Sequence, residues 1–107
     1  MKPCELTAAA AARFARLVND DAEYEALPEA DKREVELHLA AARGFVAGYA
    51  GLDLDTCPYE DVTAALLMIF AEMTDNRQVT QQYTGQNPTA LAILNLHSTN
   101  LLPGGRA

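Results

Sequence analysis

The chain has 107 residues, half of them apolar, which favours one folded domain with a single hydrophobic core over a disordered polymer. Its formal net charge of −7 argues against binding nucleic acid through the phosphates, because that mode needs clustered lysine and arginine. We therefore expect no sequence-specific contact with DNA.

Neither a membrane segment nor a signal peptide is expected. The longest apolar run, residues 64–71, is far shorter than the roughly 20 residues that cross a bilayer, and no apolar stretch with a cleavage site follows Lys2. Cys4 and Cys57 are isolated, without ligand spacing, which favours two free thiols in a reducing cytosol over a disulfide.

The sequence lacks the strict alternation of half-buried strands and predicts helices joined by loops. The first predicted helix begins after Thr7, a good N-cap, and runs through the alanines to about Val18. Phe14 and Leu17 join Val18 in its apolar stripe. Residues 19–21, Asn-Asp-Asp, are then expected to break the pattern.

A long second helix is predicted from near Pro28 to Gly51, which is placed to cap it in a left-handed conformation. Its roughly 23 residues would make a rod of about 35 Å. Apolar residues at steps of three and four define one face: Val35, Leu39, Ala42, Phe45, Val46 and Tyr49.

Two glycines, Gly44 and Gly48, lie inside this predicted helix. Each destabilises a helix by about 1 kcal/mol relative to alanine, so some contact should offset that cost. With the neighbouring alanines they form a smooth strip that another backbone can approach closely. The strip predicts either close packing within the chain or a contact between neighbouring copies.

A third helix is predicted from Pro58 to Arg77, and because it is apolar nearly all round we expect it to be the buried centre. The fold class is thus all-α, a small bundle of about four helices with the long second helix packed on the buried third. We expect a single domain over 1–107, with a core at 29–77, a flexible polar loop at 78–87, and a C-terminal helix and tail at 88–107, the helix opening at Asn87-Pro88.

The helix pair resembles that of the head–tail connector (adaptor) proteins of tailed phages, of the siphophage type. In that family the long helix commonly ends on Ala-Ala-Arg, a few mixed residues, and Tyr-x-Gly, as in residues 41–51 here. A proline, an acid, an alanine and an aliphatic run ending in Asn-Arg follow, as Pro58, Asp61, residues 65–69 and Asn76-Arg77 do here. The match covers residues 29–77.

The resemblance implies a non-enzymatic structural protein without a cofactor. Such proteins circulate in the host cytoplasm and then join the virion at the head–tail junction, where about a dozen copies close into a ring through one repeated contact. The ring joins the portal protein to the head-closure or tail protein, and it extends the channel through which DNA passes during packaging and ejection.

Candidate contacts with other subunits or partners follow from the resemblance, the glycine strip and the C-terminal part: Arg43, Gly44, Gly48, Asn76, Arg77, Gln78, Tyr83, Leu101 and Leu102. For Arg43 and Arg77 the alternative is a surface or intrachain ion pair, worth about 0–1 kcal/mol. Candidate channel-facing acids, which would repel DNA, are Asp20, Asp21, Glu23 and Glu25; the alternative is a solvated acidic surface that keeps the domain soluble.

Other classes of function have weaker signals. A small acidic helical inhibitor that mimics DNA would need acids spaced like phosphates along one face, whereas these acids cluster in one loop and one helix start. Glu34 and His38, four residues apart, could bind a metal but have no third ligand in view, so a helical metal-dependent hydrolase is disfavoured. His97 is expected in the core or an interface, and no catalytic, metal or cofactor site is predicted.

Overall fold

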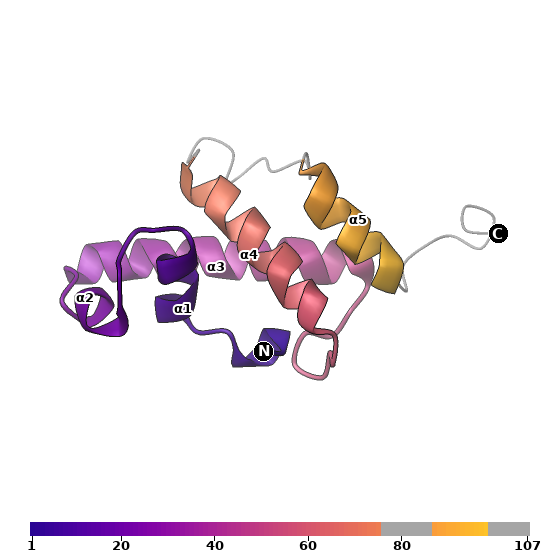
Figure 1. Cartoon of the computed structure of the whole chain (residues 1–107), viewed down its shortest axis with the longest axis horizontal. Coiled ribbons are helices and arrows are strands. Elements are labelled where there is room, and N and C mark those ends of the chain that lie inside the picture. Colours follow the sequence, from indigo (N-terminus) through magenta and orange to yellow (C-terminus); the bar gives the residue numbers. More distant parts are fainter. Residues whose placement is uncertain (76–86, 99–107) are drawn as a thin grey trace.

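The computed structural model describes residues 1–75 and 87–98, and within these ranges every regular element is a helix. Figure 1 shows their arrangement. The bounds are η1 Pro3–Glu5, α1 Ala8–Phe14, α2 Asp21–Glu25, α3 Glu29–Ala50, α4 Glu60–Asp75 and α5 Pro88–His97. The predicted all-α bundle is confirmed; α3, α4 and α5 are the second, third and fourth predicted helices.

The long helix α3 has the caps that its sequence predicts. Pro28 is still extended at its N-terminus, and Glu29 and Asp31 lie in the first turn, where the positive end of the helix favours acids. Gly51 ends the helix in the left-handed conformation, at φ 69° and ψ 32°, and its N–H donates to the carbonyl of Ala47 at 2.9 Å. The 22 residues between give a rod of about 33 Å.

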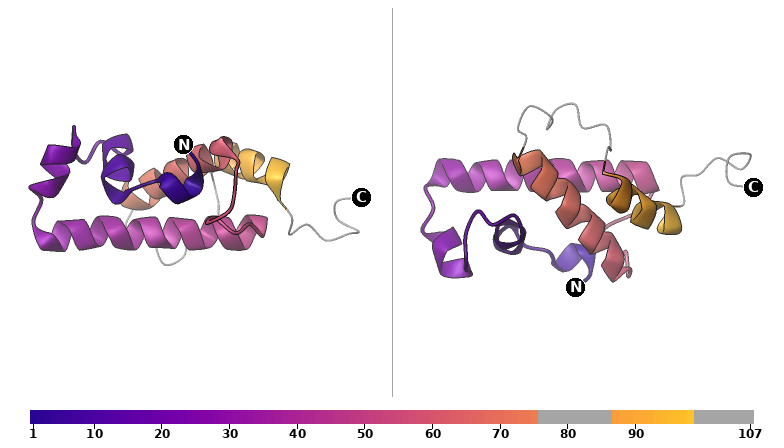
Figure 2. Two further views of the ribbon diagram at one scale, coloured as in Figure 1. Left: turned by 90° about the horizontal axis from the view of Figure 1, so that it is seen from below. Right: turned by 45° about the horizontal axis from the view of Figure 1, so that its top comes forward.

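The other helices lie on one side of this rod. Figure 2 shows α1, α4 and α5 on the same side of α3, with α4 crossing it obliquely and α5 beside α4. The short N-terminal segment with η1 runs along α4 on that side as well. The architecture is therefore two layers, in which α3 is one layer by itself and the remaining described helices form the other.

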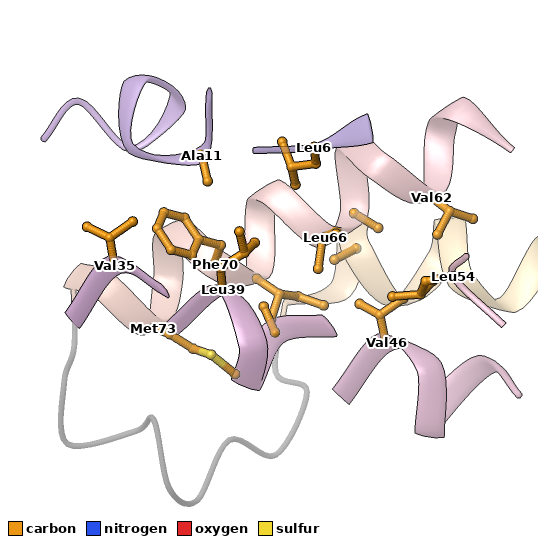
Figure 3. Close-up of a cluster of buried hydrophobic side chains, with 14 of the residues drawn as sticks. Leu6, Ala11, Val35, Leu39, Val46, Leu54, Val62, Leu66, Phe70 and Met73 are labelled. Carbon is orange, nitrogen blue, oxygen red and sulfur yellow. The ribbon is translucent and has the colours of Figure 1, made fainter. Parts of the chain in front are cut away.

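The hydrophobic core lies between these layers and is centred on α4. Leu66, Ile69 and Phe70 are completely buried, and in Figure 3 the ring of Phe70 lies among side chains of α1 and α3, including Ala11 and Val35. The prediction that this helix is the buried centre is confirmed. It begins at Glu60, two residues later than the proline expected to open it.

The first predicted helix is shorter than expected. Thr7 caps α1 as predicted, accepting a hydrogen bond from the N–H of Ala10 at 3.1 Å, but the helix ends at Phe14 and not near Val18. Arg16 adopts the left-handed conformation, at φ 63°. The amides of Arg16 and Leu17 then bond to the carbonyls of Arg13 and Ala12, which is the Schellman pattern that glycine usually supports.

Residues 19–21 were expected only to break the helical pattern, but in the structure they also begin a further helix. Asp20 is the N-cap of a further helix, α2, and its carboxylate accepts from the N–H of Glu23 at 2.8 Å. The carboxylate of Glu23 in turn accepts from the backbone N–H of Asn19 at 3.0 Å. These residues therefore do not end α1, which already stops at Phe14; they begin α2, as side-chain capping predicts.

Candidate functional site

The exposed face of α3 is the first candidate surface. We call it the outer face of α3 and define it by Leu37, Ala40, Gly44 and Gly48, which follow one another at steps of three or four residues and are all exposed. Leu37 leaves 63% of its surface accessible. The layer of α1, α4 and α5 lies against the opposite side (Figure 2), so no described helix covers this apolar stripe.

The glycines of this face have open space around them. A Cβ atom built at Gly44 or at Gly48 meets no heavy atom within 4 Å. Close packing within the chain, one of the two explanations for the glycines, is therefore wrong for the part of the chain that the structure describes. A contact between copies stays a prediction.

A shallow groove adjoins the C-terminal part of this face. Its volume is about 340 Å³, and it lies between α3 and the segment that leads to α4. Gly44 and Ala47 line it together with the apolar Leu52, while Arg43 and two aspartates, Asp53 and Asp55, add both signs of charge. A partner seated on the outer face would thus meet polar groups at the edge of an apolar stripe.

Arg43 makes an intrachain contact. Its guanidinium Nη2 donates to the backbone carbonyl of Leu6 at 2.7 Å in a partly buried position. The segment before α1 is held again at α4, where the hydroxyl of Thr63 donates to the carbonyl of Met1 at 2.7 Å. Arg43 therefore anchors the N-terminal segment, through a backbone hydrogen bond in place of the ion pair considered from the sequence.

The four candidate channel acids lie together at α2, at one end of α3 (Figure 1). Each of them contacts its own chain: Asp20 and Glu23 make the capping bonds described above, Arg13 Nε lies 3.1 Å from Asp21 Oδ1, and Lys32 Nζ lies 3.6 Å from Glu25 Oε2. All four are exposed, so these pairs are screened by solvent and worth little individually.

Beneath these acids, the ring of Tyr24 is buried. Burial raises the pKa of its hydroxyl, and the negative charges of Glu36, Glu25 and Glu29 raise this pKa further. The side chain is therefore neutral at physiological pH. Lys32 Nζ lies 5.9 Å from the ring centroid, in cation–π range, which attaches the start of α3 to α2.

At the opposite end, α5 is held to α3 and α4 by polar contacts that the sequence did not reveal. His97 Nε2 lies 2.8 Å from Asp61 Oδ2, and the imidazole stacks on the ring of Tyr59 at a centroid distance of 4.0 Å. The hydroxyl of Tyr49 on α3 donates to Asn95 Oδ1 at 3.0 Å. His97 thus pairs with an acid at the surface end of α4, rather than lying in an apolar core.

Three further expectations from the sequence concern the two cysteines, a metal site and a membrane segment. Cys4 and Cys57 are free thiols, as favoured from the sequence. Among residues 1–75 and 87–98, no three His, Cys, Asp or Glu side chains are arranged to hold a metal ion, Glu34 and His38 included. No helix in this same part of the chain has both the length and the apolar character to span a bilayer.

The remaining candidate contacts lie outside the described residues: Asn76, Arg77, Gln78, Tyr83, Leu101 and Leu102. The predicted loop at 78–87 also lies outside them, apart from Asn87, whose side chain caps α5 by accepting from the N–H of Ala90 at 3.0 Å. The structure thus brings together Gly44 and Gly48 on one face, places Arg43 beside them, and gathers the acids at a separate end.

Comparison with known proteins gave no match: no family model fits the chain, and no curated protein or solved structure is significantly similar to it.

Proposed function

We propose that this chain is a structural component of a phage or prophage head–tail junction, where copies of it assemble into a ring. The observation that carries the proposal is the outer face of α3. A helix that exposes Leu37 and two interior glycines loses stability, and no contact among residues 1–75 and 87–98 offsets this loss. A contact with another copy would bury this face, and the small residues would let the backbone of that copy approach closely.

The size of the face explains why closure would be needed. The outer face, from Leu37 to Gly48, is about 17 Å long and about 10 Å wide and so covers roughly 170 Å² on each copy, which is well below the roughly 800 Å² that each partner buries in a stable complex. One such contact is weak. In a closed ring of copies joined head to tail, each copy makes two contacts. The ring can therefore be stable although an isolated pair of copies is not.

In this role the ring sits on the portal protein of a filled head and offers its other side to the head-closure or tail protein. The passing DNA is not bound in a sequence-specific way. The exposed acids at α2 support this part of the proposal, because a negative surface near the channel repels the phosphate backbone.

The alternative, an acidic helical inhibitor that mimics DNA, has less support. Each of the four acids at α2 contacts a group of its own chain: Asp20 is the N-cap of the helix, and Glu23 accepts from the N–H of Asn19. These carboxylates serve local structure, and they gather at one end of the molecule instead of following an extended face at phosphate spacing.

Negative-stain electron microscopy tests the proposal. The purified chain is imaged at high concentration, alone and mixed with the portal protein of the same phage or prophage. We expect closed rings of uniform diameter in at least the mixture. Only monomers, or open filaments of variable length, in both samples would contradict the proposal.

A further inference from the structure

A basic and apolar surface lies where α1 ends. Phe14 and Leu17 leave 49% and 44% of their surfaces accessible, and neither belongs to the described hydrophobic core. Arg13 and Arg16 lie beside them in the sequence and are also exposed. We call these four residues the α1 patch. Aromatic side chains and arginines are enriched at contacts between proteins, so the composition of the α1 patch is that of a contact surface.

Arg16 is the residue of the α1 patch whose charge is not balanced by a neighbour. Arg13 Nε lies 3.1 Å from Asp21 Oδ1, whereas the guanidinium of Arg16 makes no hydrogen bond or ion pair with residues 1–75 or 87–98. The backbone of Arg16 is left-handed, at φ 63°, a conformation that favours glycine. An arginine thus stands where its backbone is strained and where the described chain gives its side chain no partner.

The groove beside the outer face of α3 has room for an apolar side chain. Its volume of about 340 Å³ lies at the lower end of the range for ligand pockets, about 300–1,000 Å³. Gly44, Ala47 and Leu52 contribute to its lining, and the two small residues allow an apolar group to approach α3 closely. Because the groove is shallow, it suits a side chain carried by another protein better than a small molecule, which is usually enclosed.

The groove also carries the charge opposite to that of the α1 patch. Its lining includes two aspartates and one arginine, and this arginine, Arg43, already donates to the carbonyl of Leu6. The carboxylate of Asp53 accepts from the N–H of Asp55 at 3.0 Å. The carboxylate of Asp55 is exposed and has no hydrogen-bond or ion-pair partner among the described residues. An unpaired cation on the α1 patch thus corresponds to an unpaired anion at the groove.

We propose that the α1 patch of one copy docks into this groove of the next copy, an inference that rests on the proposed assembly. Phe14 fills the apolar part of the groove beside Gly44, and Arg16 pairs with Asp55. A second copy is favoured over a different protein because this chain carries both complementary surfaces. The local pair of opposite charges also sets the orientation of two copies whose net charges, −7 each, otherwise repel.

The positions of the two surfaces determine the type of assembly. α1 lies toward the N-terminal end of α3, whereas the segment that leads from α3 to α4 lies at the other end (Figure 1). Because the two surfaces differ and lie apart, each copy has one of each left for a further neighbour. The contact is therefore head to tail, the type that closes into a ring when the rotation between copies fits.

An exchange of charges between two variants tests the contact. Arg16→Asp places an acid opposite Asp55, and Asp55→Arg places a base opposite Arg16, so each variant alone should associate at least about tenfold more weakly than the wild type. In an equimolar mixture, every contact between unlike variants joins an acid to a base, and association should return to within about threefold of the wild type. Sedimentation velocity measures the three samples. A mixture that associates no better than the single variants would overturn the pairing.

NMR extends this test to contacts that are too weak for sedimentation. ¹⁵N-labelled Asp55→Arg is mixed with unlabelled Arg16→Asp or, as the matched control, with unlabelled Asp55→Arg. We expect concentration-dependent shifts at the amides of Phe14, Gly44 and Leu52 with the first partner only. Equal shifts with both partners, or none with either, would overturn the proposal.

A third variant separates the contact from folding. Arg16→Gly removes the side chain and relieves the left-handed backbone, so its melting temperature should equal or exceed that of the wild type while its association falls about tenfold. Unchanged association of Arg16→Gly would overturn the role of this arginine, whatever its melting temperature.

Failure of this contact and failure of the assembly have different signatures. Closed rings from both single charge variants would disprove only the contact. Association of the mixed variants without closed rings of the wild type would disprove only the proposed ring. No association of the wild type or of the mixture by either method would contradict both.

Discussion

The two faces of α3 use small residues in opposite ways. On the covered face, Ala42 is completely buried between Leu39 and Val46, so its small size lets the second layer approach the helix. On the outer face, a Cβ atom at Gly44 would touch nothing in the part of the chain that the structure describes. Packing within the chain therefore explains the small residue on the covered face. The small residue on the outer face needs another explanation.

The largest effect should come from the centre of the covered side. Replacing Phe70 by alanine removes a completely buried ring and is expected to lower the free energy of unfolding by about 3–5 kcal/mol. Since small domains have about 5–15 kcal/mol in total, the variant should be close to unfolding. Urea denaturation measures this, and a loss below about 1 kcal/mol would mean that the two layers are not packed as described.

A pair of leucines on the same helix tests the contrast between its faces directly. Leu39→Ala, on the covered face with 6% exposed, should cost about 2–5 kcal/mol. Leu37→Ala, with 63% exposed, should change the free energy of unfolding of the monomer by about 0.5 kcal/mol or less. Thermal and urea unfolding of both variants measures these changes. Similar losses of unfolding free energy in the two variants would contradict the distinction between the faces.

Arg43 lies at the boundary between the faces, and its effect should be intermediate. Arg43→Ala removes the charged donor to the carbonyl of Leu6 and is expected to cost about 2 kcal/mol. Hydrogen exchange at residues 1–7 should rise more than exchange in α4, because the N-terminal segment loses one of its anchors. Unchanged exchange in that segment would show that the bond does not hold it.

One substitution on the outer face should have the opposite sign and stabilise the chain. Gly44→Ala adds a methyl group where there is room and improves helix propensity, so the free energy of unfolding should rise by about 1 kcal/mol. Ala40→Gly on the same face is the matched reversal and should lower it by a similar amount. A loss of stability in Gly44→Ala would place an unseen contact on this face.

The sequence predicted best what local chemistry decides. Thr7, Gly51 and Asn87 end or begin helices through bonds to residues three or four positions away, so their roles can be predicted without the fold. The burial of α4 was also predictable, because a helix that is apolar nearly all round has few polar positions to present to water.

The failures have a physical cause as well. Arg16 ends α1 in a left-handed conformation that a glycine normally signals, and because no glycine stands there this helix end could not be predicted from the local residues. The bond from Arg43 to Leu6 spans 37 positions and the pair of Asp61 and His97 spans 36, and such contacts depend on how the helices cross. The exposure of the glycine strip was one of two predicted alternatives, since periodicity alone does not say which face a second layer covers.

The association of copies through the outer face of α3 is tested most directly by sedimentation velocity of two variants, Gly44→Leu and Glu36→Leu. The free energies of unfolding of both variants are measured in parallel. Both variants add an exposed leucine to α3, but only the first obstructs the outer face. The account predicts that Gly44→Leu folds at least as stably as the wild type yet remains monomeric under conditions where the wild type and Glu36→Leu assemble. Assembly of Gly44→Leu equal to that of the wild type would contradict it.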